Sequence, residues 1–529
     1  MTLQDDGGRP VTLPALLDWL NDGEELAFID IREEGLYGEG HPLLAVNVPY
    51  SLLETALPPL VPRAGTRVVL LGDEADVTAR AIARLSALGY DRLYFLSGGV
   101  SAWEHGGQPL FKGVNVPYKA FAEFVEHLLH TPDITPDELA RLIERQEDYI
   151  LLDSRTVEEY DRFHVPSAIA VPSAELLYRF DDLVPSPETL VVVSCAGRTR
   201  GIIGAQTLIN AGVPNKVVAL SGGTQGWRLA DLATVRDDAR YFPPLSKRAQ
   251  QSSAERAAAL AQRYGVRVID AATLGQWQSD PQRTTYLFDV RNHDEYLRGH
   301  RAGARWAPGG QLVQSLDKWA GTRNARIVLN DNDGIRATTT AHWLLQLGWD
   351  AVVLPGFDAA DARPVASSPQ SLPSVPVIDA HEASRRLAAG ALALSADRSW
   401  DYRLAHPAGA RWVNRSRLTD ALPAVADTAA GILVFAGQGP LAEGVARDLI
   451  AAGYDAKRVS GSPQDWRAAG LTVQSSPQDP PAAQQIDYLF WVHDRHDGNA
   501  AASAAYLAWE ADLPRQVADP AVAHFNIRR

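Results

Sequence analysis

The sequence predicts an α/β protein made of four tandem domains, each a small parallel sheet with helices on both faces. Two observations lead to this prediction. Short apolar runs rich in β-branched residues alternate with stretches that have apolar residues at helical spacing, and a set of short motifs returns along the chain. Strands that alternate with helices form parallel sheets, because the chain must cross over between parallel strands. A chain of 529 residues is also too long for one hydrophobic core.

The first repeated motif is an aspartate, an arginine two residues later, and then a tyrosine and a histidine. Its complete copies are Asp30, Arg32, Tyr37 and His41; Asp153, Arg155, Tyr160 and His164; and Asp289, Arg291, Tyr296 and His300. A fourth copy keeps Tyr402 and His406 but has Ser395 and Asp397 at the first two positions. A repeat with this spacing indicates four related units.

The second motif is a glycine-rich turn followed by a tryptophan. It occurs at 96–103, 220–227 and 459–466, and in degenerate form at 354–361, where Asp361 replaces the tryptophan. Together the motifs predict domains at 1–113, 114–240, 241–370 and 371–475, followed by a C-terminal tail at 476–529.

Several elements follow from local patterns. We expect helices at 13–20 and at 118–130, the latter with an apolar face, and a helix entry with proline in its first turn at 133–136. The Gln/Ser/Ala-rich stretch 249–262 and the Ser/Pro-rich stretch 367–373 are expected to connect domains. In the tail we expect a helix near 500–511 and an aromatic run at 488–492 that docks on the body or on a second subunit, as in a homo-oligomer.

Composition excludes several classes of protein. The formal net charge of −14 argues against nucleic acid or an acidic membrane surface as the main partner. No apolar run reaches the ~18 residues of a membrane helix, so we expect a cytoplasmic protein. The single cysteine excludes an internal disulfide framework. His493 and His496 lack a third ligand, so we expect no metal site, and no cofactor is indicated.

That single cysteine, Cys195, follows the apolar run 190–193 and precedes a helical pattern that ends at Gly212. It therefore lies in a turn between a strand and a helix, where backbone N–H groups converge and the helix dipole adds positive potential. Arg198 and Arg200 add positive charge. We therefore expect the pKa of the thiol to be lowered, and we favour a reactive cysteine over an inert buried one.

This loop, with its flanking motifs, resembles the active-site loop of the rhodanese family of sulfurtransferases. The resemblance covers about 75 residues: Asp153, Arg155, Glu159, Tyr160, His164 and Ala168 upstream, the loop itself, and the motif that ends in Trp227 downstream. Ser167 stands where the family has glycine. The resemblance implies a thiosulfate sulfurtransferase in which Cys195 takes sulfur from a small sulfur-containing anion and passes it to a thiol or cyanide.

The resemblance also suggests roles for the loop. Backbone N–H groups from Ala196 to Gly201 would surround the sulfur, and the arginines would bind the donor's sulfonate. These substrate-binding candidates are Ala196, Gly197, Arg198, Thr199, Arg200 and Gly201. Asp153 and Arg155 are supporting candidates, expected to form a fold-holding ion pair because the pair recurs in domains without a cysteine. His164 is expected to be structural for the same reason.

Counting back 17 residues from the glycine after each equivalent helix aligns the four loops. Gly72, Asp331 and Ala436 then stand at the position of Cys195. None is a sulfur nucleophile, so the other three domains are expected to be inactive. Asp331 could act as a carboxylate nucleophile, but a helix cap is the favoured interpretation.

Two alternative functions remain open. A cysteine phosphatase or arsenate reductase needs five residues between its cysteine and its arginine, whereas Arg200 comes one residue too early. The other alternative is a persulfide carrier that delivers sulfur to a partner protein, with the cysteine-free domains as its docking surface.

Overall fold

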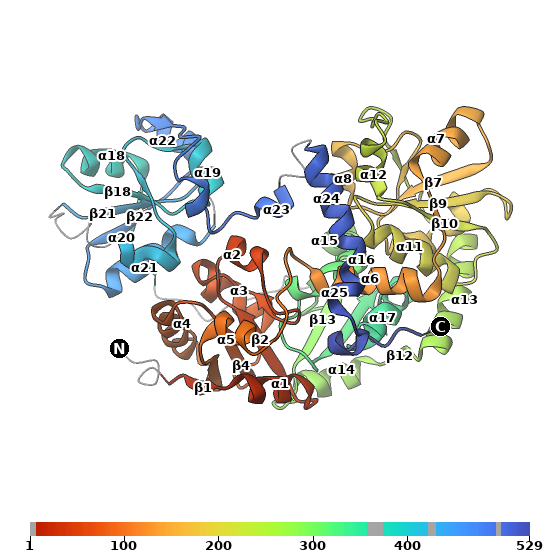
Figure 1. Ribbon diagram of the computed structural model, residues 1–529, viewed down its shortest axis with the longest axis horizontal. Helices are drawn as coiled ribbons and strands as arrows, with labels where there is room; N and C mark the ends of the chain where they lie inside the picture. The colour runs from red at the N-terminus through yellow and green to blue at the C-terminus, as the bar shows by residue number, and fades with distance from the viewer. Residues whose placement is uncertain (1–6, 357–373, 422–429, 438, 494–498, 529) are drawn as a thin grey trace. The chain divides into compact units, whose positions relative to one another are not determined.

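The computed structural model describes residues 7–356, 374–421, 430–437, 439–493 and 499–528. They form two compact units, shown in Figure 1. Unit one consists of residues 1–114 and 367–490, and unit two of residues 115–366 and 491–529. The Ser/Pro-rich linker expected at 367–373 and Asp361 lie outside the described residues.

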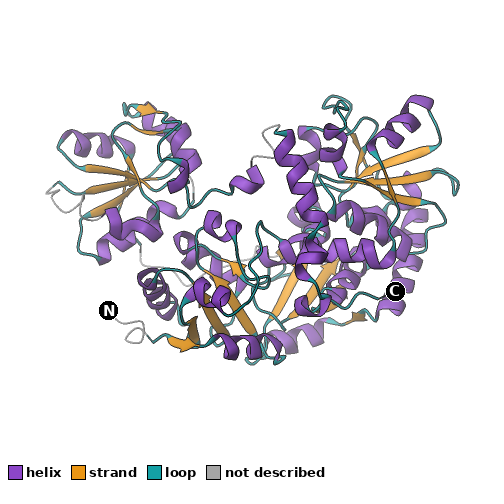
Figure 2. Ribbon diagram, viewed as in Figure 1, coloured by secondary structure: helices purple, strands orange, loops and turns teal. Residues whose placement is uncertain are grey.

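Four sheets in the described residues share one strand order, which confirms the predicted fold class. The orders are β1-β5-β4-β2-β3, β6-β10-β9-β7-β8-β11, β12-β16-β15-β13-β14 and β17-β22-β21-β18-β20. All pairings within them are parallel, and a short antiparallel pair, β19 with β23, accompanies the fourth. Figure 2 shows helices on both sides of the strands. Parallel strands buried on both faces account for the continuous apolar runs in the sequence.

Unit one contains the first and fourth sheets. The elements of its first segment are β1 (Arg9–Val11), α1 (Leu13–Asn21), β2 (Leu26–Asp30), α2 (Glu34–Glu39), β3 (Val46–Asn47), η1 (Tyr50–Leu52), α3 (Leu53–Leu60), β4 (Arg67–Leu71), α4 (Ala75–Ala87), β5 (Leu93–Leu96) and α5 (Gly99–His105). Those of its second segment are β17 (Val377–Ile378), α18 (Ala380–Ala388), β18 (Leu392–Ser395), α19 (Ser399–Leu404), β19 (His406–Pro407), β20 (Arg411–Trp412), η4 (Arg415–Arg417), α20 (Leu418–Ala421), β21 (Ile432–Phe435), α21 (Leu441–Ala451), β22 (Ala456–Val459), α22 (Pro463–Ala468), β23 (Val473–Gln474) and η6 (Ala482–Gln484).

Unit two contains the second and third sheets. The elements around the second sheet are α6 (Val116–Leu129), β6 (Asp133–Ile134), α7 (Pro136–Arg145), β7 (Tyr149–Asp153), α8 (Val157–Arg162), β8 (Ile169–Ala170), α9 (Glu175–Tyr178), α10 (Phe180–Leu183), β9 (Leu190–Ser194), α11 (Thr199–Asn210), β10 (Val217–Leu220), α12 (Gly223–Leu229) and β11 (Arg240–Tyr241). Those around the third are α13 (Lys247–Tyr264), β12 (Arg267–Val268), α14 (Ala271–Gln278), β13 (Thr285–Asp289), α15 (His293–Arg298), β14 (Arg305–Trp306), α16 (Gly309–Ser315), η2 (Leu316–Lys318), β15 (Arg326–Asp331), α17 (Ile335–Gln346) and β16 (Asp350–Pro355). The tail adds α23 (Phe490–His493), α24 (Ala500–Ala511), α25 (Leu513–Val517) and η7 (Pro520–Ala523).

The two sheets of unit two share one hydrophobic cluster. The buried ring of Phe121 on α6 packs edge-on against Trp343 on α17, with ring centroids 5.8 Å apart, and against Phe525 near the C-terminus at 5.2 Å. The helix expected at 118–130 is therefore α6, whose apolar face packs against both the third domain and the tail. Burial of this much apolar surface joins the second domain, the third domain and the C-terminal segment into one folded unit.

One expected connector is a helix. The stretch 249–262 belongs to α13, an 18-residue helix that Ser246 caps at its N-terminus and Gly265, with φ of +70°, ends. Alanine and serine have small side chains, and Ala249, Ser253 and Ala257 are buried on the packed face of the helix. We interpreted the polar composition as that of a bridge, but it belongs to the exposed face of a packed helix.

A buried charge cluster connects the two sheets of unit one. Arg415 of η4 binds Glu54 of α3, with Nη1 to Oε2 at 2.5 Å, and Asp448 of α21, with Nε to Oδ2 at 2.8 Å. The Tyr50 hydroxyl donates to Asp448 at 3.0 Å. All three charged side chains are less than one tenth exposed. Each charge is therefore compensated by a direct partner away from water.

Candidate functional site

The strand registers place the four loops at the same point of each sheet. Asp153 pairs with Ser194, and Asp30, Asp289 and Ser395 pair in the same way with Leu71, Asn330 and Phe435. The next residues are Cys195, Gly72, Asp331 and Ala436. The register therefore confirms the loop alignment that we derived by counting back from the glycines, and Cys195 is the only cysteine in the chain.

Cys195 lies between the end of β9 and the start of α11, as predicted. The glycine-rich turn before α12 supports its loop: the N–H of Thr224 donates to the Cys195 carbonyl at 2.8 Å. Gly223 has φ of +55°, and a Cβ there would lie 2.3 Å from that carbonyl oxygen. The second glycine of the motif is therefore required by a close backbone approach to the cysteine loop.

The expectation of a lowered pKa at Cys195 is wrong. The side chain is buried, with 2% exposed, and this burial raises the pKa of the thiol. The charge of Arg200 and N–H groups of Gly201 and Gly197 oppose the effect of burial, while the carboxylate of Glu510 adds to it. The convergent N–H groups that we expected are present, but loss of water around the sulfur outweighs them.

Arg200 forms an ion pair beside the cysteine. Its Nη1 and Nη2 donate to the two carboxylate oxygens of Glu159 at 2.6 and 2.8 Å. Burial alone would raise the pKa of Glu159, but Arg200 outweighs it and lowers that pKa to about 2. The guanidinium is thus fixed by a carboxylate while its charge also acts on Cys195.

Arg198 points to a different element. Its Nε donates to Glu123 of α6 at 2.7 Å, and its Nη2 contacts both Glu123 and Glu126. Burial raises the pKa of Glu123 to about 7 in spite of this pair. Binding of a donor sulfonate by Arg198 stays a prediction, and such binding would have to compete with two carboxylates.

The supporting residues form the same arrangement in three copies. Arg155 binds Asp153 through Nε and Nη2, with Nη2 to Oδ2 at 2.7 Å, and also donates to the Phe163 carbonyl. Arg32 with Asp30 and Arg291 with Asp289 repeat this geometry in domains without a cysteine. His164 stacks on Tyr160 with centroids 3.9 Å apart, and the equivalent histidines of the other copies do the same. This recurrence indicates a structural role for both features.

Sequence reasoning missed Glu510 on α24. Its carboxylate accepts a hydrogen bond from the Thr199 hydroxyl at 2.6 Å, and only 2% of the residue is exposed. The helix itself was predicted at 500–511, but nothing in the sequence indicated that it would pack across the cysteine loop. One weak signal was available: a lone glutamate in an otherwise apolar, alanine-rich helix needs a polar partner when it is buried.

A cavity of about 410 Å³ lies next to the loop. Its lining includes Ala196 of the loop, Phe163 and the exposed arginines Arg162 and Arg228, and the first turn of α24 closes one side with Ala500 and Ser503. The Arg228 guanidinium lies 5.3 Å from the Phe163 ring centroid. The lining also includes two carboxylates, Glu159 and Asp231, and a cavity of this size can hold a small molecule beside the cysteine loop.

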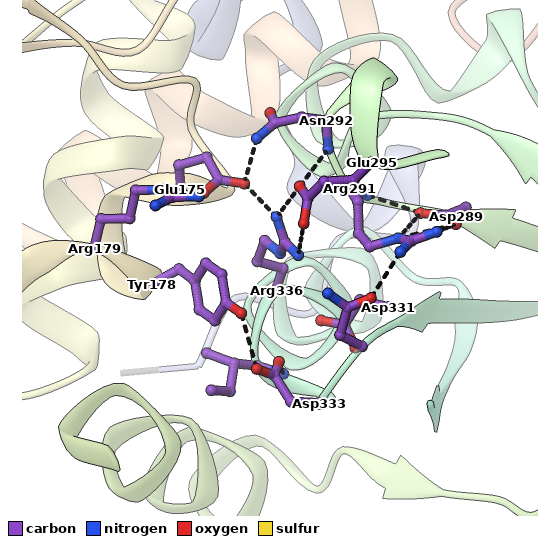
Figure 3. Close-up of polar contacts among 12 residues, drawn as sticks. Glu175, Tyr178, Arg179, Asp289, Arg291, Asn292, Glu295, Asp331, Asp333 and Arg336 are labelled. Atoms are coloured by element: carbon purple, nitrogen blue, oxygen red, sulfur yellow. Dashed lines mark hydrogen bonds and ion pairs between the residues drawn. The ribbon is translucent and has the colours of Figure 1, made fainter. Parts of the chain in front are cut away.

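The equivalent loop of the third domain is shown in Figure 3. Asp331 is buried, and its carboxylate accepts hydrogen bonds from the N–H groups of Gly334 and Ala337 at the start of α17. Burial raises the pKa of Asp331 to about 6. Arg336 binds Glu295 as Arg200 binds Glu159, and also binds Glu175 of α9 at 2.6 Å. These contacts agree with the helix-cap interpretation of Asp331.

Neither a metal centre nor a membrane span is visible where the structure describes the chain. Its residues include no group of three or more His, Cys, Asp or Glu side chains that could hold a metal ion. His496, one of the two histidines considered above, lies outside the described residues. No helix in the described ranges is both long and apolar enough to cross a bilayer.

Comparison with known proteins agrees with the fold and the loop. A model of the rhodanese-like domain matches residues 12–105, 135–230 and 270–357. The crystal structure of a thiosulfate sulfurtransferase from Pseudomonas aeruginosa is 38% identical, with a TM-score of 0.91 over 98% of this chain and all of that one. This chain belongs to the rhodanese family. Membership supports a sulfurtransferase or a sulfur-carrier activity.

More distant relatives share single domains. A putative sulfur carrier protein of Bacillus subtilis, YrkF, is 26% identical over 102 residues, which are 19% of this chain. The chain spans about half the length of that curated relative, 54%. A rhodanese-related protein from Thermoplasma volcanium is 23% identical over 20% of this chain and 99% of its own, with a TM-score of 0.18.

Proposed function

We propose that this protein is a sulfurtransferase that moves a sulfane sulfur from thiosulfate or a similar anion to a thiol or cyanide, through a persulfide on Cys195. The observation that supports it best is the position of Cys195. It is the one cysteine of the chain, held where a strand meets a helix and N–H groups of Gly197 and Gly201 reach its sulfur. The same register position holds Gly72, Asp331 and Ala436 in the other domains. The active domain is 114–240, and 371–475 is a diverged fourth copy, supported by its strand order.

The proposed reaction has two displacements. The Cys195 thiolate attacks the outer sulfur of thiosulfate, a bond forms between Sγ and that sulfur, and sulfite leaves with the electron pair of the broken S–S bond. The acceptor then attacks the outer persulfide sulfur, and the Sγ–S bond breaks to return the thiolate. Loop N–H groups and the Arg200 charge stabilise the anionic sulfur in both steps. The 410 Å³ cavity next to Ala196 offers room for the acceptor.

Mass spectrometry of the intact protein tests this proposal. After incubation with thiosulfate alone, the chain should be heavier by one sulfur atom, and cyanide or a thiol should remove that mass. Without a second cysteine, no internal disulfide can discharge the persulfide. Cys195→Ser should stay folded and unmodified. No added mass on the wild-type protein would contradict the proposal.

A second candidate is a persulfide carrier that gives its sulfur to a partner protein. The similarity to a putative sulfur carrier protein, 26% identical over 102 residues, supports it. A persulfide that forms but is released slowly to every small acceptor would support the carrier. Hydrolysis of an aryl phosphate without a sulfur adduct would instead support a cysteine phosphatase.

A further inference from the structure

Helix α24 places a carboxylate directly on the cysteine loop. Glu510 Oε1 accepts the Thr199 hydroxyl at 2.6 Å, and its Oε2 lies 3.3 Å from where a Cβ on Gly197 would be. The absence of a side chain at Gly197 is what lets this oxygen come so close to the loop backbone. Glu510 therefore occupies space directly over the loop that begins at Cys195.

Packing holds α24 in this position. The Leu507 side chain lies within 3.5 Å of where Cβ atoms on Gly197 and Gly222 would be, so it covers both the loop and the turn that supports it. The Lys119 ammonium lies 5.2 Å from the ring centroids of both Tyr506 and Trp509. These contacts fix α24 against α6 and α12, so Glu510 faces the loop as part of a packed helix.

The loop arginines are paired with carboxylates other than Glu510. Arg198 is already bound to Glu123 and Glu126, and Arg200 to Glu159. Among the described residues neither arginine forms a hydrogen bond or an ion pair with Glu510, whose carboxylate accepts a hydrogen bond from the neutral Thr199 hydroxyl. A hydroxyl at the start of α11, near the positive end of the helix, is a group that would bind an oxyanion. The Glu510 carboxylate thus occupies the place where an incoming anion would bind.

We propose that Glu510 is an internal competitor for anionic ligands at the Cys195 loop. Its carboxylate takes the Thr199 hydroxyl and the space over Gly197 that a sulfonate would use, and its charge repels anions. An anionic sulfur donor must therefore displace Glu510, whereas a neutral reagent meets only the steric cover of α24. The identification of the anion as the sulfur donor rests on the proposed function. The competition between Glu510 and anions does not.

Two alkylating reagents of nearly equal size test the proposal on the full chain. Iodoacetate carries a negative charge and iodoacetamide does not, so the ratio of their rates with Cys195 reports access for anions, and the thiolate fraction cancels. Glu510→Gln should raise this ratio about tenfold, which corresponds to about 1.4 kcal/mol. The thiosulfate concentration for half-maximal persulfide formation should fall by a similar factor.

Two controls separate charge from access. Asp512→Asn removes a charge two residues away that binds Arg515 and Gln516, and should leave the ratio unchanged. Leu507→Ala loosens the cover without changing charge, so both rates should rise together. A ratio unchanged in a folded Glu510→Gln protein would overturn the proposal. A raised ratio without any persulfide would support Glu510 as the competitor and contradict the sulfurtransferase instead.

Discussion

Arg200 and Glu159 are joined by two hydrogen bonds, and Arg336 and Glu295 repeat the pair at the equivalent position of the third domain. In the third domain the pair stands beside Asp331, and in the second beside Cys195. The pair thus recurs in the two domains of unit two, and the second domain differs from the third in having the thiol of Cys195 at the first position of its loop.

Replacement of Arg200 should make the thiol less acidic. Its charge opposes the raised pKa of Cys195, so Arg200→Ala should raise that pKa further and slow the reaction with iodoacetamide at pH 8, because less of the thiol is ionised. Anionic donors should also bind less tightly by roughly 1–3 kcal/mol. The pH dependence of alkylation measures the first effect. Arg141→Ala, on the exposed surface of α7, is the control, and equal pKa values in both variants would refute the role of Arg200.

Replacement of Asp331 should affect stability and not sulfur transfer. Asp331→Ala removes the acceptor for two N–H groups at the start of α17 and should cost about 1–2 kcal/mol of unfolding free energy, as loss of a helix cap does. Asp331→Asn, which keeps one carbonyl acceptor, should cost less. Urea denaturation gives these values, and persulfide formation on Cys195 should be unchanged. A large loss of transfer activity in folded Asp331→Asn would revive the nucleophile interpretation.

Removal of Arg415 should strongly destabilise unit one. Arg415→Met leaves Glu54 and Asp448 buried without their main cation, and removal of one partner from such a cluster costs about 3–5 kcal/mol. Chemical denaturation of the full chain measures the loss. Arg411→Met, at an exposed position of β20, should change stability little. Equal unfolding free energies of the two variants would show that the cluster makes no net contribution to stability.

Glu33 should make stability depend on pH. Burial raises its pKa to about 7 from an ordinary value of 4.5, with the Ser51 N–H and hydroxyl as donors. The folded state therefore holds the proton more tightly than the unfolded state, and the unfolding free energy falls as pH rises from 4.5 to 7.

The Glu33→Gln protein should lack this loss, because a neutral amide mimics the protonated acid and the Ser51 hydroxyl can accept a hydrogen bond from it. The variant should match the wild type below pH 4.5 and exceed it by roughly 3 kcal/mol at pH 8. Urea denaturation at several pH values measures the difference. Glu104→Gln, on the exposed side of α5, is the control. A constant difference between wild type and Glu33→Gln at all pH values would contradict this account.

The sequence alone was sufficient for the architecture and for the position of the cysteine. Local patterns placed β9 and α11 on either side of Cys195. Counting back from the glycine after each equivalent helix aligned the four loops, and the strand registers match that alignment. Such features depend on residues close in sequence, such as the glycines that permit a tight turn at 222–223 and the apolar runs that fill a parallel sheet. Composition gave a wrong expectation at 249–262, where small and polar residues suggested a connecting segment but form part of the packed helix α13.

The tertiary structure decided the electrostatics of the site. The pKa of Cys195 depends on how far its neighbours exclude water from the thiol, and no local sequence pattern indicates that burial. Glu123 on α6 and Glu510 on α24 lie 75 and 311 residues from their loop partners, Arg198 and Thr199, so their contacts with the loop follow only from how those helices pack. The thiol and the arginines of the loop lie close together in sequence. Some of the carboxylates that neutralise or oppose their charges come from α6 and α24, which only the tertiary structure places beside the loop.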